Sequence, residues 1–129
     1  MKANEPPFLL VIESDTHVRN ILAAELENNF TTQFFTSLTD AEKAQKNKSL
    51  VENPVAAVVE LNFSNKNELA QYCDFFDKLP DVPIFLTLDY NSDYQLNESS
   101  IKSITKNILF RPFDVDKFIS FLLAQNLKH

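Results

Sequence analysis

The sequence contains no glycine among its 129 residues, although glycine normally makes up about 7% of a protein. Glycine-rich phosphate loops and dinucleotide-binding fingerprints need glycine where the backbone approaches the ligand, so both kinds of site are excluded. Turn positions with positive φ must fall to other residues, and asparagine tolerates them best. We therefore expect such turns among five asparagines, namely Asn28, Asn29, Asn62, Asn65 and Asn107.

Cysteine and histidine are also scarce. Cys73 is the single cysteine, which rules out an internal disulfide and fits a reducing compartment, so we expect a cytoplasmic protein. We expect Cys73 to be a buried helix residue. The histidines His17 and His129 stand alone, and no Cys/His spacing typical of a zinc site is present.

Positive charge and long apolar runs are missing as well. The chain has 12 Lys and Arg against 18 Asp and Glu, a net charge of −6. Because proteins that bind nucleic-acid backbones are normally basic, we expect no direct DNA or RNA partner. No apolar run approaches the ~20 residues of a membrane helix. The polar start MKANEPP lacks the apolar core of a signal peptide, so we expect no membrane contact.

Five short apolar runs alternate with segments of helical spacing. The runs predict strands at Phe8–Glu13, Phe30–Thr36, Val55–Leu61, Val82–Leu88 and Asn107–Phe110. The helical segments lie near residues 15–28, 38–51, 66–78, 92–105 and 114–126. The first, third and fourth runs are continuous, which is typical of strands covered on both faces. The length fits one domain over residues 1–129, with a tail at residues 1–7.

Alternation of strands and helices with short loops predicts the α/β class. We expect a five-stranded parallel sheet in a three-layer α/β/α sandwich, a (βα)5 or flavodoxin-like fold with right-handed crossovers. In such sheets, functional residues gather at the carboxyl ends of the strands, near the switch point of the strand order. The residues at four of these ends are Glu13-Ser14-Asp15, Glu60, Thr87 and Arg111-Pro112. They should converge on one cleft.

These strand ends resemble the receiver domain of bacterial two-component response regulators, the CheY-like family. The resemblance spans nearly the whole chain, and the stretches that carry it are LLVIESDTHVR, VVELNF, VPIFLT and LFRPF. The resemblance implies a phosphorelay signalling module rather than an enzyme. In active members, two acids after the first strand and an aspartate after the third hold Mg²⁺, and that aspartate accepts a phosphoryl group. A hydroxyl on the fourth strand and a lysine on the fifth contact the phosphoryl oxygens.

Several of these positions depart from the family's pattern. Glu60 stands at the phosphoacceptor position, Ser14 replaces one of the paired acids, and Arg111 stands at the lysine position, whereas Thr87 matches. Ile108 also stands where the family often has an aromatic ring. Mg²⁺ demands near-ideal geometry from charged oxygen ligands, so we expect no catalytic residues and no metal. If any metal binds, Glu13, Asp15 and Glu60 would hold it, although Asp15 is also a good helix cap.

We interpret the chain as a degenerate receiver, or pseudo-receiver, that acts independently of phosphorylation. Arg111 can grip a carboxylate bidentately, so we expect it to pair directly with Glu60 and to imitate the phosphoryl–lysine contact. Three alternatives remain. The cleft is inert and only an interaction surface is kept, or it retains Mg²⁺-dependent phosphorylation, or the chain is a flavodoxin-like ligand-binding protein or enzyme. The last is disfavoured because ESDTH is not a phosphate loop.

The resemblance also implies a partner surface, because receivers usually act through the face formed by the fourth helix, fifth strand and fifth helix. The last helix, VDKFISFLLAQNL, carries Phe121 and Leu123 beyond its buried stripe, and an apolar helix wider than one face suggests contact with a second protein. We expect a protein partner, an output domain or a second copy to contact a face comprising Ile108, Phe110, Phe118 and Phe121. The alternative is that Phe121 packs sideways on a neighbouring helix.

Overall fold

A computed structural model describes residues 6–79 and 81–124 of the chain. Within these residues, five parallel strands form one sheet in the order β2-β1-β3-β4-β5. The strands are β1 (Phe8–Ile12), β2 (Thr31–Phe35), β3 (Ala56–Glu60), β4 (Ile84–Asp89) and β5 (Ile108–Arg111). The helices are α1 (Thr16–Leu26), α2 (Leu38–Lys46), α3 (Lys66–Asp77), α4 (Ser92–Leu96), α5 (Glu98–Ile104) and α6 (Val115–Ala124). The expected α/β class and parallel sheet are confirmed.

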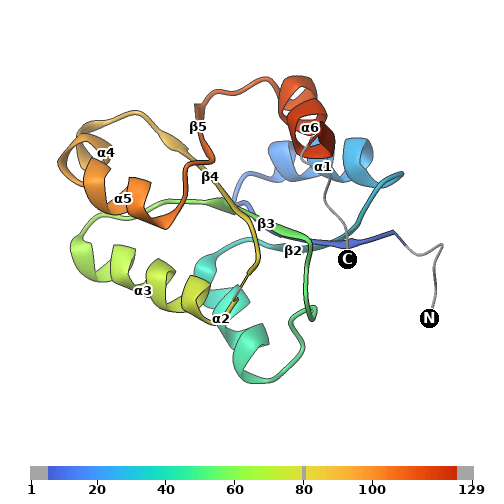
Figure 1. The fold of residues 1–129 in the computed structure, drawn as a ribbon, viewed down its shortest axis with the longest axis horizontal. Helices are drawn as coiled ribbons and strands as arrows, with labels where there is room; N and C mark the ends of the chain where they lie inside the picture. The colour runs from blue at the N-terminus through green and yellow to red at the C-terminus, as the bar shows by residue number, and fades with distance from the viewer. Residues whose placement is uncertain (1–5, 80, 125–129) are drawn as a thin grey trace.

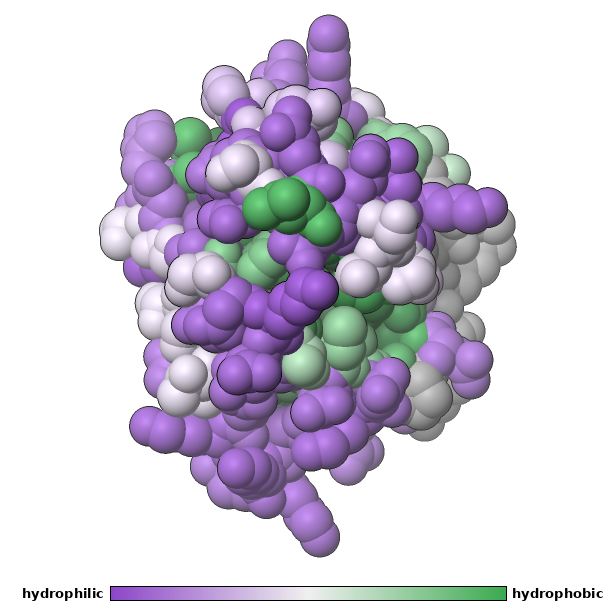
Figure 2. Space-filling model, turned by 90° about the vertical axis from the view of Figure 1, so that its left-hand side faces the viewer, coloured by the Kyte–Doolittle hydropathy of each residue, from purple (hydrophilic) through white to green (hydrophobic). Residues whose placement is uncertain are grey.

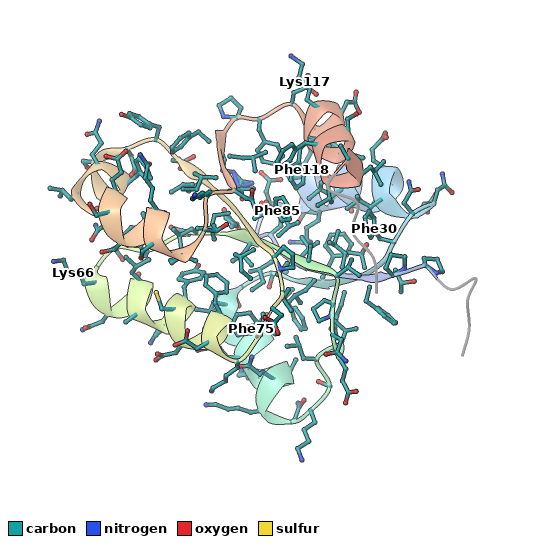
Figure 3. The ribbon with its side chains drawn as sticks, viewed as in Figure 1. Phe30, Lys66, Phe75, Phe85, Lys117 and Phe118 are labelled. Carbon is teal, nitrogen blue, oxygen red and sulfur yellow. The ribbon has the colours of Figure 1, made fainter. Side chains whose placement is uncertain are left out.

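The helices cover both faces of the sheet and give three layers (Figure 1). Helices α1 and α6 lie on one face, and α2 and α3 lie on the other, with α4 and α5 beside β4 and β5. Figure 3 shows Phe75 of α3 on one side of the sheet and Phe85 and Phe118 on the other, while Lys66 and Lys117 point away from the core. The two layers bury separate apolar clusters.

Alternation along the strands assigns each side chain to one of these clusters. In β1, Leu10 and Ile12 join the cluster under α3, whereas Leu9 and Val11 join the cluster under α1 and α6. The central strands β1, β3 and β4 are almost fully buried, which explains their continuous apolar sequences. Burial on both faces positions the strand ends firmly, so the polar residues that follow β1 and β3 lie at fixed places.

Short polar side chains begin five of the helices, and in α6 this residue is Asp114, whose Oδ1 accepts from the Lys117 N–H group. Asp15, Ser37, Asn65 and Asn91 accept hydrogen bonds from backbone N–H groups in the first turns of α1, α2, α3 and α4. This satisfies donors that have no partner inside a helix. The predicted helix at 92–105 is divided into α4 and α5, because Asn97 ends one helix and begins the other, and its Nδ2 donates to the Asp93 carbonyl at 2.8 Å.

Two local expectations are wrong. The described residues with positive φ are Lys48, Asn53 and Asp81, not the five asparagines expected from the absence of glycine. The first two lie in the loop between α2 and β3, where the chain reverses direction. Cys73 is half-buried rather than buried, because it lies at the margin of the face that α3 presents to the sheet. Among the described residues, no helix has the length and hydrophobicity needed to span a membrane.

Candidate functional site

Four polar side chains lie on the same face of the sheet at its carboxyl edge. Glu13 directly follows β1, Glu60 ends β3, Thr87 lies near the end of β4, and Arg111 ends β5. Each is two residues beyond a side chain of the cluster under α1 and α6, so alternation directs all four to that face. Strand register places Glu60 opposite Thr87 and Asp89 opposite Arg111. The structure therefore brings together Glu13, Glu60, Thr87 and Arg111, as expected from the strand ends.

Arg111 binds Glu13 through both carboxylate oxygens. Its Nη2 donates to Glu13 Oε1 and Oε2, each at 2.7 Å, and its Nη1 lies 3.3 Å from Oε1. Glu13 is only 2% exposed, so this is a nearly buried ion pair with charge-assisted hydrogen bonds. The Phe113 ring lies 6.0 Å from the guanidinium carbon, which adds a cation–π contact.

Glu60 makes a weaker contact with the same guanidinium. Arg111 Nη1 lies 3.4 Å from Glu60 Oε2, and the backbone N–H of Ser14 donates to Glu60 Oε1 at 2.8 Å. The expected ion pair between Glu60 and Arg111 is present, but the bidentate grip that we assigned to it falls on Glu13. Glu60 turns only Oε2 toward the guanidinium, because its Oε1 is held by the Ser14 N–H in the loop after β1.

The pKa of Glu13 is raised above its ordinary value of 4.5, chiefly because burial penalises the charged carboxylate. The neighbouring charges of Glu60 and Asp15 raise the pKa further, whereas the Asp15 N–H group and the Arg111 guanidinium lower it. The Asp15 N–H group and Arg111 thus oppose the effect of burial on the pKa of Glu13.

Asp15 acts as a helix cap. Its Oδ1 accepts from the N–H groups of His17 at 2.8 Å and Val18 at 3.2 Å. Its own N–H donates to Glu13 Oε2 at 3.1 Å. Arg19 of α1 holds the same loop by donating to the carbonyls of Glu13 and Ser14. The loop after β1 is therefore fixed by hydrogen bonds.

The donor set of the cleft does not fit Mg²⁺ in this arrangement. All four oxygens of Glu13 and Glu60 already face an N–H donor or the guanidinium, and Asp15 is committed to α1. A divalent ion would have to displace Arg111 from both carboxylates. Within residues 6–79 and 81–124, no group of three or more His, Cys, Asp and Glu is arranged to hold a metal ion.

Among the described residues at this edge, Thr87 is the polar side chain with a buried hydrogen-bonding group that has no partner. It is 1% exposed, and its Oγ1 is buried without a hydrogen-bond partner. Leaving a hydroxyl in this state costs on the order of 1–3 kcal/mol. Thr87 lies opposite Glu60 in the strand register, but it does not line any of the three hollows beside Glu60.

Three hollows meet at Glu60. One of about 110 Å³ lies toward α4, one of about 320 Å³ lies toward α2 and α3, and one of about 430 Å³ lies toward α6. The sequence reasoning missed the residues that line the first hollow from the α4 side, Asp89, Asp93 and Tyr94. Asp89 ends β4, and Asp93 and Tyr94 follow it in α4; this place at the carboxyl end of a strand was the signal that could have identified them.

The expected partner face changes in one respect. Phe118 is 2% exposed and packs edge-on against Phe85 and Phe113, so its assignment to a partner surface is wrong. It belongs to the stripe with which α6 faces the sheet. Phe121 is 43% exposed, although its ring also contacts Phe85 at 6.0 Å between centroids. Ile108 and Phe110 are half-buried.

A hollow of about 340 Å³ lies on this side of the molecule. Its lining comes from β5, α6 and the loops beside them, and it includes Ile108, Phe121 and the lysines Lys106 and Lys117. Because β5 is the last strand of the sheet, no further strand pairs with it among the described residues. Helix α6 and the edge of the sheet thus offer one mainly apolar surface, with two lysines and Asp114 at its margin.

Comparison with known proteins rests on structure alone. No protein-family model matches the sequence, and no curated protein is significantly similar to it. A response regulator from Thermotoga maritima matches with a TM-score of 0.70 and 16% identity over 92% of this chain and 96% of the other. The receiver domain of Francisella response regulator 1452 matches with a TM-score of 0.69 and 17% identity over 95% and 99% of the two chains.

The receiver domain of nitrogen regulatory protein C gives a TM-score of 0.67 at 19% identity and covers 89% of this chain and 90% of the other. At these identities the similarity establishes the fold. The chain has the CheY-like fold of response-regulator receiver domains.

Proposed function

We propose that the chain is a signal-transduction module that acts through protein–protein contacts and does not depend on phosphoryl transfer. Two features support the proposal: the receiver fold, matched over most of the chain, and the ion network in the cleft. The observation that carries it is the position of Arg111, which lies between two carboxylates and holds both.

The network supplies internally the cation that a phosphorylatable cleft takes from solution. Receivers of the family place Mg²⁺ among their acids, whereas here a guanidinium is bound to Glu13 at 2.7 Å and faces Glu60 at 3.4 Å. Glu60 carries one negative charge, compared with about two on a phosphoryl group. Arg111 and Glu60 therefore form a permanent, weaker version of the contact that phosphorylation would create.

Phosphoryl transfer to Glu60 is disfavoured by position and by charge. Phosphoryl transfer relies on positioning and charge neutralisation, and displacing the reacting atom by about 1 Å can cost ~100-fold in rate. Glu60 is one methylene longer than aspartate, and its Oε1 is already held by the Ser14 N–H. An incoming phosphate anion would also meet Glu13, Glu60 and Asp89 with one guanidinium to offset them.

The output surface that fits this proposal is the side formed by β5 and α6. There, the exposed ring of Phe121 adjoins the hollow that Lys106 and Lys117 border. A partner that fits it carries an apolar segment with acidic residues beside it.

Amide NMR titration with Mg²⁺ followed by beryllofluoride, which mimics a phosphoryl group on a carboxylate, tests the proposal. We expect no saturable shifts at millimolar Mg²⁺ around Glu13, Glu60 and Thr87, and no further change with beryllofluoride. Saturating, site-specific shifts would overturn the proposal, because they would mean that the cleft still works as a phosphoacceptor pocket.

The matched control is the triple variant Ser14→Asp, Glu60→Asp and Arg111→Lys, which supplies the acids and the lysine of active receivers. It should respond to both additions at the same backbone positions. A response in the triple variant beside silence in the wild type would attribute the silence to these three side chains and not to the fold.

A further inference from the structure

Strand β2 forms a free edge of the sheet. The strand order gives it one neighbour, β1, and no other strand in the described part of the chain pairs with it. Thr31 is exposed and the other four residues of β2 are half-buried, so the described residues do not bury this strand. A free edge presents a row of backbone N–H and C=O groups to which another strand can bind.

The hydrogen bonds between β2 and β1 show which backbone groups of β2 point outward. The Thr31 N–H donates to the Pro7 carbonyl at 2.9 Å, and the Phe35 carbonyl accepts at 2.9 Å from the residue that follows β1. Because backbone groups alternate in direction along a strand, the N–H and C=O groups of Thr32 and Phe34 point away from β1. These groups have no hydrogen-bond partner among the described residues.

The edge of β2 lacks the features that usually prevent strand pairing. Residues 28–39 contain no charged side chain and no proline, and the threonines and phenylalanines of β2 favour extended structure. The opposite edge, β5, is bordered by Lys106, Arg111 and Pro112. Charges and prolines are common protections of edge strands, so pairing with another chain is expected at β2 and not at β5.

Symmetry and charge select a second copy of the chain as the strand that binds β2. Pairing of β2 with β2 about a two-fold axis uses the free edge of each copy and closes after two chains, whereas pairing of β2 with β5 would continue without end. The chain carries a net charge of −6, so two copies repel each other. An uncharged edge adds no like charges at the point of contact.

Antiparallel pairing centred on Gln33 satisfies the outward groups of β2. It places the N–H and C=O groups of Thr32 opposite those of Phe34 in the second copy, and the two-fold axis repeats the arrangement. Thr32 then lies beside the Phe34 ring of the other copy, and such pairs of β-branched and aromatic residues stabilise sheets. By contrast, Figure 2 shows the side that carries α4 and α5, where the surface is mainly hydrophilic around small apolar areas. That side is less suited to contact between two copies.

We propose that a second copy of this chain binds along the free edge of β2, so that the two sheets join into one across a two-fold axis. The inference goes beyond the proposed function and does not rest on it. Because β5 is the opposite edge of the sheet, the surface formed by β5 and α6 stays available to a different partner in each copy of the dimer.

Light scattering at protein concentrations between micromolar and millimolar, together with amide hydrogen exchange by NMR, tests the dimer. We expect the mass to rise from one chain to two, and the exchange of the Thr32 and Phe34 amides to slow as the dimer forms. The Gln33 amide, which faces β1, should be protected throughout. A single-chain mass at every concentration would overturn the inference, and so would a dimer in which Thr32 and Phe34 stay unprotected. Protection of both amides already in the monomer would mean that another segment of the same chain covers the edge, which also overturns it.

Thr32→Pro removes one outward N–H and keeps the hydrogen bonds to β1, and prolines are tolerated on edge strands. Dimerisation should weaken about tenfold or more, because one hydrogen bond is lost on each side of the axis. Thr32→Lys, which brings like charges to the axis, should weaken it as well and replaces the proline variant if a thermal melt shows that variant to be unfolded. Thr39→Lys, at an exposed residue of α2, is the matched control and should dimerise as the wild type does. Equal weakening by both lysine variants would reduce the effect to net charge and overturn the inference.

Phe121→Ser separates this dimer from one formed through α6. Phe121 is exposed on α6, and its replacement should leave dimerisation through β2 unchanged. A dimer that Phe121→Ser breaks and Thr32→Pro keeps would lie on α6 and overturn the inference. The mass measurement and the Mg²⁺ titration fail separately: a monomer overturns the pairing of β2 alone, and a response to Mg²⁺ and beryllofluoride overturns the proposed function alone.

Discussion

Replacing Arg111 with alanine is the most direct perturbation of the cleft. Arg111→Ala removes three contacts to Glu13 of 2.7, 2.7 and 3.3 Å and the 3.4 Å contact to Glu60. Glu13 then keeps one hydrogen bond, from the Asp15 N–H, and remains in a position where it is 2% exposed. Breaking a buried pair by removing one partner typically costs about 3–5 kcal/mol.

Protonation of Glu13 sets an upper limit on this cost. A carboxyl with an ordinary pKa of 4.5 can be neutralised at pH 7 for about 3.4 kcal/mol, at roughly 1.36 kcal/mol per pH unit. Glu13 will therefore become protonated in the folded variant, and the loss in the free energy of unfolding will not exceed this value. At pH 5 the same limit is only about 0.7 kcal/mol. We expect a loss of about 2–3 kcal/mol in the free energy of unfolding at pH 7, and a loss that shrinks to about 0.7 kcal/mol or less at pH 5.

The pH dependence of the stability follows from the direction in which the pKa of Glu13 is shifted. The pKa of Glu13 is raised in the folded protein, so the folded state holds this proton more tightly than the unfolded state does. The contribution of Glu13 to stability is therefore present below pH 4.5 and is lost as the pH rises through the folded pKa. Arg111 lowers that pKa, so its removal raises the pKa further and enlarges the loss at neutral pH.

Urea unfolding of the wild type and the variant at pH 7 and pH 5 measures these values. Subtracting the two curves cancels the titration of groups that the substitution does not affect. A loss that is the same at both pH values, or below about 1 kcal/mol at pH 7, would refute the assignment of Arg111 as the counter-ion of Glu13. The double variant Arg111→Ala and Glu13→Gln is the control, because without the carboxyl the residual loss should no longer depend on pH.

Three further predictions concern single residues of the same cleft. Glu60→Gln should lower the pKa of Glu13, because the Glu60 charge raises it; ¹³C NMR titration of the carboxyl carbon measures the pKa, and an unchanged or higher value would contradict the coupling. Thr87→Val should leave the free energy of unfolding unchanged or increase it by about 1 kcal/mol, because the hydroxyl has no partner; a loss above about 1 kcal/mol in urea unfolding would mean that the hydroxyl is bonded. Asp15→Ala should lower the free energy of unfolding by about 1 kcal/mol through loss of the α1 cap, and Asp15→Asn should lose less; an alanine variant as stable as the wild type would exclude the capping role.

The convergence of the site could be predicted because it depends on topology. Parallel strands end at one edge of the sheet, so Glu13, Glu60, Thr87 and Arg111 had to meet once the strands were identified. The choice of partner within the cleft could not be predicted. Whether Arg111 grips Glu13 or Glu60 depends on differences of less than 1 Å in the reach of flexible side chains. Periodicity constrains which face a residue takes but not such distances.

The helices and strands could likewise be predicted only in part. Apolar periodicity located all five strands to within two residues, because strands buried on both faces leave a strong pattern. It merged α4 with α5, because Asn97 interrupts the helix through a side-chain hydrogen bond that leaves no mark on apolar spacing. Phe118 was assigned to the partner surface, but it lies in the buried stripe with which α6 faces the sheet.

The two-sided hold of Arg111 also limits how the cleft can change by substitution. Ser14→Asp adds a carboxylate to a site where one guanidinium already serves Glu13 and Glu60. Arg111→Lys exchanges a planar fork for a single ammonium that cannot grip one carboxylate bidentately while facing the other. Each step toward the acids and the lysine of phosphorylatable receivers is therefore unfavourable until the others are made, because every single substitution is opposed by the contacts that remain.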